Sequence, residues 1–279
     1  MSAVNIQKKR DDIAIRAEGL TVSYGSRIIQ HDLTFSIRRG DVFVIMGGSG
    51  CGKSSLMRVL MGLLPPGAGR FFYGDEDFWA APSARRAQIM RGVGVLFQSG
   101  ALWSSRTLAE NVMLPLEYYT SLPRGIRRSI ASLRLAQVGL AGFEEYYPSE
   151  ISGGMKKRAG LARALALDPQ IVFFDEPSAG LDPLSAAQLD ELILELRDSM
   201  GMTVIMVTHE LPSIFAVADD AIFLDAGLRT LTAQGNPREL LRHGPPEVAR
   251  FLRRGKDETD EHSEPSRAVP GKDDSGAET

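Results

Sequence analysis

The sequence lacks several features that would each define a class of protein. It has one cysteine, Cys51, among 279 residues, so no internal disulfide can form, and a thiol-poor chain fits a reducing compartment. Its formal net charge is only −3, so it has no overall basic field that would attract nucleic acid, and we expect no nucleic-acid partner. The N-terminal segment 1–12 is polar, lacks the apolar core of a secretory signal and is expected to be flexible.

Long apolar runs are also missing. The richest ones, 42–46 and 171–174, have the length of strands, whereas a membrane-spanning helix needs roughly 18 apolar residues. Any role at a membrane is therefore expected to depend on partner chains. The last segment, 255–279, has eight acidic and three basic residues, hence a charge of −5, which leaves +2 for the rest of the chain. Because this segment has one valine and no aromatic residue, we expect an acidic, disordered tail.

The rest of the chain shows strand and helix patterns in alternation. Residues 13–24 alternate apolar and polar side chains and predict an edge strand, as do residues 33–37, whereas the continuously apolar segment 42–46 predicts a central strand. From about 99 to 169, leucine, alanine and arginine recur at helical spacing, which predicts an inserted helical subdomain. Further strands are expected at 93–97, 171–174, 203–207 and 221–224, and helices at 53–63, 183–199 and 211–218. Such alternation favours a mostly parallel sheet.

A glycine-rich segment lies between the predicted central strand and the helix that follows it. It fits G-x-x-x-x-G-K-[ST] and comprises Gly47, Gly48, Ser49, Gly50, Cys51, Gly52, Lys53 and Ser54, followed by Ser55. Its glycines allow consecutive backbone N–H groups to bind an anion, and the helix N-terminus adds a positive dipole end. Lys53 is expected to contact the β- and γ-phosphates of a nucleoside triphosphate, and the Ser54 hydroxyl to bind Mg²⁺. By itself the motif predicts a nucleoside triphosphatase of unspecified kind.

Two carboxylates end the predicted strand 171–174. Asp175 and Glu176 lie at its carboxyl end, where open α/β sheets bind ligands. We expect Asp175 to hold Mg²⁺ through water and Glu176 to polarise the attacking water as general base. Acidic strand ends are common, so the catalytic interpretation depends on the pairing of these carboxylates with the phosphate-binding loop.

A second anion-binding helix start is predicted at Ser152. Ser152 suits an N-cap, and Gly153 and Gly154 leave the following backbone N–H groups uncovered. One γ-phosphate does not need two such sites from one chain, so we expect this one to serve the ATP of a second copy. For this segment taken alone, an ordinary N-cap before a basic helix is an equal alternative.

Together these motifs resemble the ABC ATPase family over nearly all of residues 13–252. The segment from Ser152 to Gly154, with Arg158 and the sequence Ala-Arg-Ala-Leu that follows, is similar to the signature of that family. The resemblance assigns four further roles, namely a magnesium-binding Q-loop glutamine, a D-loop aspartate, a switch histidine and an adenine-stacking tyrosine, to Gln98, Asp182, His209 and Tyr24. The side-chain chemistry suits each role, and the order and spacing of the whole set carry the resemblance.

The resemblance implies an α/β fold of the P-loop NTPase (RecA-like) type. Its mostly parallel sheet would carry an antiparallel β edge and an inserted α-helical subdomain. The implied divisions are a core of 13–98 and 170–235, a helical subdomain of about 99–169 and C-terminal helices at 236–254. It also implies an ATPase that closes on ATP and Mg²⁺ as a homodimer and that drives a multi-span membrane permease.

One residue that differs from the usual family signature indicates a particular subgroup of transporters. Met155 stands where most members carry glutamine, and with 46–55, 97–102 and 208–211 it resembles the Mla or MCE-associated lipid transporters of bacterial envelopes. That subgroup implies a location at the cytoplasmic face of the inner membrane, a STAS-domain partner and a periplasmic MCE lipid-binding protein. The surface 99–116 is expected to receive the permease, through a docking groove that includes Ala101, Leu102, Trp103, Val112, Leu114 and Leu116. Some of these are expected to pack the helical subdomain instead, and Trp103 to be partly exposed.

Two other functions remain open from the sequence. An importer ATPase for another solute would carry the same nucleotide motifs, since binding a γ-phosphate does not depend on the solute. A soluble ABC ATPase acting on ribosomes or DNA usually has two ATPase units or a long coiled-coil insertion. This chain has one phosphate-binding loop and no heptad run.

Overall fold

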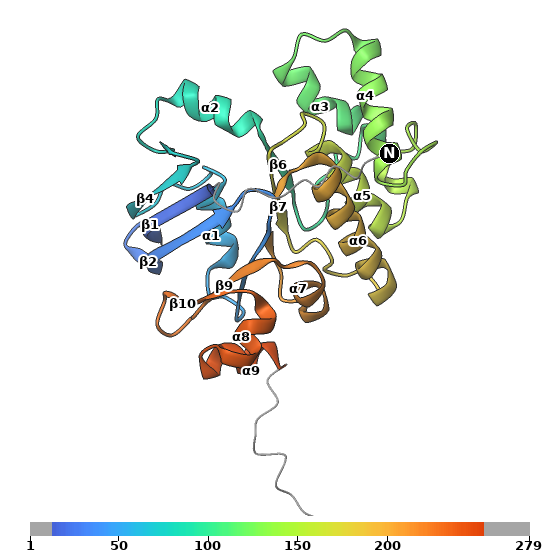
Figure 1. The fold of residues 1–279 in the computed structure, drawn as a ribbon. Coiled ribbons are helices and arrows are strands. Elements are labelled where there is room, and N and C mark those ends of the chain that lie inside the picture. Colours follow the sequence, from blue (N-terminus) through green and yellow to red (C-terminus); the bar gives the residue numbers. More distant parts are fainter. Residues whose placement is uncertain (1–12, 254–279) are drawn as a thin grey trace, which may run out of the picture.

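A computed structural model describes residues 13–253 of the chain (Figure 1). The N-terminal segment 1–12 and the acidic tail 255–279, for which flexibility was expected, lie outside the described residues. The strands are β1 (Ile13–Tyr24), β2 (Arg27–Arg38), β3 (Val42–Gly47), β4 (Ala68–Tyr73), β5 (Glu76–Asp77), β6 (Val93–Leu96), β7 (Ile171–Asp175), β8 (Thr203–Val207), β9 (Asp220–Leu224) and β10 (Leu231–Gly235). The helices are α1 (Lys53–Leu60), α2 (Ser83–Arg91), α3 (Leu108–Tyr119), α4 (Arg124–Gln137), the 3-10 turn η1 (Pro148–Glu150), α5 (Gly153–Ala164), α6 (Pro183–Met200), α7 (Leu211–Val217), α8 (Pro237–His243) and α9 (Pro246–Leu252).

The larger sheet has six strands in the order β10-β9-β3-β8-β7-β6. All neighbours pair in parallel except β10, which is antiparallel to β9 at one edge. Strand β3 lies between β9 and β8, and all six of its residues are buried, so the predicted central strand is confirmed. Its alternate residues face the two cores of the molecule, with Val42, Val44 and Met46 in one and Phe43 and Ile45 in the other.

The smaller sheet is antiparallel and has the order β2-β1-β4-β5. The prediction that residues 13–24 form an edge strand is wrong, because β1 pairs with β2 on one side and with β4 on the other. An alternating pattern indicates that one face is exposed, but it does not tell how many neighbours a strand has. This sheet and α1 cover one face of the six-stranded sheet, whereas α6 and α7 pack against the other.

Helices α3, α4 and α5 are inserted between β6 and β7 and project to one side of the sheets (Figure 1). The inserted helical subdomain is therefore confirmed. Three of the apolar residues expected to form a docking groove, Val112, Leu114 and Leu116, are instead buried in its core, whereas Trp103 is 52% exposed. No helix between residues 13 and 253 is long and apolar enough to cross a bilayer.

Candidate functional site

The loop between β3 and α1 can be formed only by glycine at two of its positions. Gly47 has φ 148° and Gly52 has φ 103°, values that L side chains rarely adopt. A Cβ on Gly47 would lie 2.5 Å from the carbonyl oxygen of Leu224, and one on Gly52 would lie 2.6 Å from Cγ2 of Ile29. The loop thus packs tightly on its neighbours at these points. A Cβ on Gly50 would meet nothing within 4 Å, so the other side of the loop is open.

Lys53 and the N-terminus of α1 face this loop. The Lys53 ammonium donates hydrogen bonds to the carbonyls of Gly47 and Gly48, both at 3.0 Å. The N-cap of α1 is Gly52, which has no side chain to satisfy the first N–H groups of the helix. Without a side-chain cap from Gly52, this helix N-terminus is suited to binding an anion.

A cavity of about 630 Å³ joins the loop to residues from three other strand ends. Because β3, β6, β7 and β8 run parallel, their carboxyl ends meet at one edge of the sheet. Sequence-predicted residues that line the cavity are Gly47, Gly48, Ser49, Gly50, Gly52, Lys53, Ser54, Ser55, Gln98, Asp175, Glu176 and His209. The structure thus brings together twelve residues that the sequence distributes over four segments.

Glu176 has the most constrained position in this cavity. Its φ is 49°, which is unfavourable for a non-glycine residue, and its backbone N–H donates to the Val207 carbonyl at 2.9 Å. One carboxylate oxygen lies 2.9 Å from Nδ1 of His209. The other, Oε2, is buried and has no partner within the described part of the chain, so it can accept a hydrogen bond from a bound water.

Asp175 lies beside Glu176 and is partly withdrawn from solvent. Burial, and secondly the charge of Glu176, raise the pKa of Asp175 above its usual range, while a hydrogen bond with Ser54 opposes this shift. A divalent cation would relieve the repulsion between the two carboxylates. The oxygen atoms of Ser54, Asp175 and Gln98 line the same cavity and suit Mg²⁺, which prefers oxygen ligands.

The second predicted anion site lies elsewhere. Ser152 is the N-cap of α5, and its hydroxyl accepts a hydrogen bond from the Met155 N–H at 3.2 Å. Ser152 and Gly154 line a separate cavity of about 420 Å³, together with Met155 and Leu181. The structure therefore does not bring Ser152, Gly153 and Gly154 to the phosphate-binding loop of the same chain.

Two other predicted residues also lie outside the phosphate cavity. The carboxylate of Asp182 caps α6 by accepting hydrogen bonds from the N–H and hydroxyl of Ser185 at 3.0 and 2.5 Å. The exposed Tyr24 donates its hydroxyl hydrogen bond to Ser55, 3.4 Å away, and accepts one from Arg58. The Ser55 hydroxyl can instead donate to the ionised phenolate, and this hydrogen bond lowers the pKa of Tyr24. Tyr24 is thus attached to the first turn of α1, and its ring is free to stack.

Sequence motifs miss two residues that shape the cavity. Gln30 is fully buried, and its amide donates to the carbonyls of Cys51 and Asp225 at 2.6 and 3.0 Å, which ties β2 to the phosphate-binding loop. Phe251 of α9 lines the cavity from the far end of the chain and packs on Phe223, with ring centroids 5.2 Å apart. Neither belongs to a motif, so only the fold identifies them.

Cys51 belongs to the loop but does not line the cavity. Its thiol is buried beneath Gly47, and this burial raises its pKa. The thiolate is the reactive form, so we expect alkylation of Cys51 near neutral pH to be at least about tenfold slower in the folded chain than in urea. MgATP should slow it further, and modification should stop ATP hydrolysis. Mass spectrometry of the single cysteine measures the rate, and equal rates in the folded and unfolded chains would contradict this placement.

Lys157 is a buried cation that connects α5 to the loop after Glu176. Its ammonium donates to the carbonyls of Pro177 and Ala179 at 2.5 and 2.6 Å, and burial lowers its pKa. We expect Lys157→Met to leave both carbonyls without this donor and to lower the free energy of unfolding by about 1–3 kcal/mol. Urea unfolding measures this change. The same substitution at the half-buried Lys156 is the control, and equal effects of the two would contradict the role of Lys157.

The fold and this cavity define a P-loop nucleotide-binding ATPase. A family model described as ABC transporter matches residues 30–179, more than half of the chain. The chain belongs to the ABC transporter family.

The relatives include proteins with two different descriptions. The chain is 42% identical over 241 residues to the "Probable ribonucleotide transport ATP-binding protein mkl" of Mycobacterium tuberculosis, an alignment that covers 86% of this chain and 66% of that protein. The chain thus spans slightly less than two thirds of this mycobacterial relative. It is 37% identical over 228 residues to the Escherichia coli "Intermembrane phospholipid transport system ATP-binding protein MlaF", which covers 82% of this chain and 84% of that one. With the Haemophilus influenzae MlaF the identity is 35% over 239 residues, covering 86% and 90%.

Solved structures of ATP-binding cassettes share the fold. The cassette cbiO1 of Clostridium perfringens, described as part of the ABC transporter complex cbiONQ, has a TM-score of 0.76 and 26% identity over 87% of this chain and 96% of its own. A dimeric, post-hydrolysis structure of the cassette MJ0796 with ADP and Pi has a TM-score of 0.71 and 27% identity over 80% and 98%. The predicted fold class is confirmed.

Proposed function

We propose that the chain hydrolyses ATP in the cavity at the carboxyl edge of the parallel sheet. The phosphate-binding loop and Lys53 bind the phosphates, and Glu176 polarises the attacking water with its unpartnered oxygen. His209 holds the other oxygen of Glu176 and is placed to donate to the γ-phosphate. Ser54, Asp175 and Gln98 would hold Mg²⁺, which would supply positive charge to the phosphates. Tyr24 is proposed to stack on the adenine.

The domain divisions follow this assignment. We place the ATPase domain at 13–254, with the core in 13–98 and 170–235, the helical subdomain at about 99–169 and the C-terminal helices at 236–254. The helical subdomain begins directly after the Q-loop residue Gln98 and ends just before β7. At these two points the chain leaves the core sheet and returns to it.

The site is proposed to be completed by a second copy of the chain. The supporting observation is that Ser152 and Gly154 line a cavity of their own, with α5 exposing its N-terminus there. A head-to-tail pair would apply this N-terminus, and the D-loop that ends at Asp182, to the ATP held by the partner. Related cassettes are dimeric in solved structures.

The driven process is proposed to be lipid transport across the bacterial envelope. The identity of 35–37% with MlaF proteins over most of both chains supports phospholipid as the cargo. The 42% identity with a mycobacterial protein described as a ribonucleotide transport protein favours a second candidate, an importer for another solute. The nucleotide cavity is compatible with both, since binding of a γ-phosphate does not depend on the transported solute.

A groove beside the Q-loop is the proposed docking surface for the membrane permease. It has a volume of about 400 Å³ and lies between β6 and the helical subdomain. Three of its lining residues are exposed aromatics, Phe97, Trp103 and Tyr119. Exposed aromatic side chains next to a groove are typical of protein interfaces. Docking there would hold the chain at the cytoplasmic face of the inner membrane.

Purification of the complex from detergent-solubilised membranes tests this function. A multi-span protein should accompany the chain, and Trp103→Glu should remove it without altering ATP binding. Mass spectrometry of the purified complex should also find a STAS-domain protein, an MCE protein and bound phospholipid. Absence of any multi-span protein would disprove the transporter role, whereas a complex without lipid or an MCE protein would favour the importer of another solute.

A further inference from the structure

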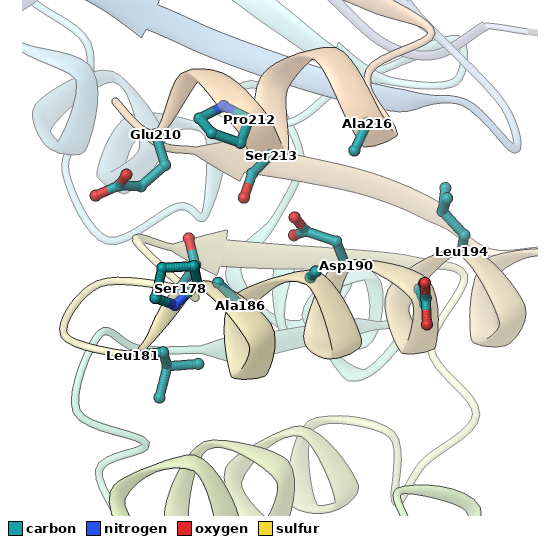
Figure 2. Close-up of a pocket in the computed structure, with 12 residues that line it drawn as sticks. Ser178, Leu181, Ala186, Asp190, Leu194, Glu210, Pro212, Ser213 and Ala216 are labelled. Carbon is teal, nitrogen blue, oxygen red and sulfur yellow. The ribbon is translucent and has the colours of Figure 1, made fainter.

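A further cleft lies between α6 and α7, on the face of the sheet opposite the antiparallel strands (Figure 2). Its volume is about 320 Å³, which is at the small end of the range for sites that bind small molecules. Leu181, Leu194 and Pro212 contribute to its largely apolar wall. None of the residues that line it appears in the nucleotide cavity.

Two buried polar atoms in this cleft lack hydrogen-bond partners. Asp190 of α6 is 5% exposed, and its carboxylate accepts a hydrogen bond from Ser213 of α7, which it faces in Figure 2. The second carboxylate oxygen, Oδ1, is buried and has no partner among the residues that the structure describes. Ser178, which is 4% exposed, has an equally unpartnered hydroxyl. Burial of a carboxylate without full compensation is unfavourable, and it raises the pKa of Asp190.

The charged side chains that line the cleft are all acidic. Besides Asp190, the described residues of its lining include Glu191 and Glu210 and no lysine, arginine or histidine. A buried carboxylate is usually paired with a cation or a donor. Within residues 13–253, Ser213 is the one donor to the Asp190 carboxylate, whereas the acidic rim would attract a cation from solution.

We propose that the cleft between α6 and α7 binds a small organic cation, an ammonium or guanidinium group on a short apolar stem. The head group would donate to Asp190 Oδ1, the one oxygen of that carboxylate without a partner. The stem would lie against the leucine and proline side chains of the wall. Glu191 and Glu210 at the rim would add long-range attraction.

The position of the cleft connects such a ligand to the ATPase site. Ser178 follows Glu176 by two residues, and Glu210 is the residue directly after His209. A bound cation would thus contact both segments that carry the Glu176–His209 pair. We therefore expect it to change the rate of ATP hydrolysis, and this part of the inference depends on the proposed function.

Calorimetric titration of the full chain without nucleotide tests the site. Pentylguanidinium and pentylammonium should bind saturably, and pentanol, which has the same stem and no charge, at least about tenfold more weakly. Asp190→Asn, which keeps the shape of the side chain, should weaken binding of both cations by about tenfold or more. Glu195→Gln, an exposed carboxylate on the same helix outside the cleft, is the matched control and should leave binding unchanged.

Ala216→Leu provides a second variant because it places a larger side chain in the lining of the cleft and leaves Asp190 in place. It should also abolish cation binding. Equal binding by the wild type and both cleft variants, or equal binding of pentanol and the cations, would overturn the proposed site. The isolated chain and the purified membrane complex should both bind the cation. If only the isolated chain binds it, a side chain of a partner occupies the cleft in the complex, and the proposal of a free cation is overturned.

An ATPase assay separates this inference from the proposed function. Addition of pentylguanidinium should change the hydrolysis rate of the wild type and leave that of Asp190→Asn unaffected. Binding without any change in rate would retain the site and overturn its coupling to hydrolysis. A wild-type chain that binds the cation and has no ATPase activity would overturn the proposed function alone.

Discussion

Replacement of Glu176 by glutamine is expected to slow steady-state ATP hydrolysis by about 10²–10⁴-fold, the range typical of a lost general base, with ATP binding intact. Glutamine keeps the length of the side chain and can still hydrogen-bond to His209, which lies 2.9 Å from the carboxylate. What it loses is the negative charge that polarises water. The rate of phosphate release and the affinity for a fluorescent ATP analogue measure the two effects separately.

The same substitution should stabilise the pair of chains with ATP bound. If hydrolysis opens the pair, the variant should elute as a dimer in the presence of MgATP and as a monomer without it. Glu195→Gln changes a carboxylate on the exposed side of α6 and should hydrolyse ATP like the wild type. Turnover by Glu176→Gln at the wild-type rate would mean that another group activates the water.

Most of the nucleotide cavity could be predicted because its residues occur in short motifs at strand ends. Once β3, β6, β7 and β8 are recognised as parallel, their carboxyl ends must meet at one edge of the sheet. The prediction that Gln98, Glu176 and His209 lie near the phosphate-binding loop therefore requires only the strand assignments and their direction. The cavity that these residues line confirms that they are neighbours.

The antiparallel sheet was harder to predict for a physical reason. Strand β4 (Ala68–Tyr73) is half exposed and has a glycine at positive φ, Gly69, as its second residue, and β5 has only two residues. The first half of β4 is exposed and lacks apolar side chains larger than alanine, and β5 is too short to show any pattern, so neither is marked as a strand in the sequence. Without β4 as a recognised neighbour, β1 was wrongly assigned to an edge. Similarly, Gln30 and Phe251 act through long-range contacts, which no local pattern records.

The connection between the two anion-binding elements also emerges only from the structure. Arg163 of α5 donates to the carbonyls of Gly100 and Ala101 at 2.8 and 2.7 Å, which fixes the loop after Gln98 to this helix. Lys157 fixes the loop after Glu176 to the same helix. Helix α5, which exposes Ser152 at its N-terminus, is therefore linked to both loops of the nucleotide cavity. Movement of α5 towards a partner's ATP would be transmitted to both of them.

A mixing experiment tests whether the ATPase site is shared between two chains. Lys53→Ala removes the cation of the phosphate-binding loop, and Gly153→Asp adds a negative charge at the N-terminus of α5. A Cβ on Gly153 meets nothing within 4 Å, and an acidic residue suits the first turn of a helix, so this variant should fold. Its carboxylate would repel the phosphates of a partner's ATP. Each variant alone is expected to lose nearly all ATPase activity, because both sites of its homodimer contain the damaged element.

The mixture of the two variants should recover activity that neither has alone. In a head-to-tail heterodimer, one site combines the intact loop of the Gly153→Asp chain with the intact Ser152–Gly154 segment of the Lys53→Ala chain, and the other site contains both defects. Half of the dimers in an equal mixture are heterodimers with one intact site of two, so activity should reach up to about a quarter of the wild-type value. If each chain completed its own site, no combination would restore an intact one. Native mass spectrometry shows whether heterodimers have formed. If they have and the mixture is still inactive, the ATPase site is not one that two chains form together and that works without the second site.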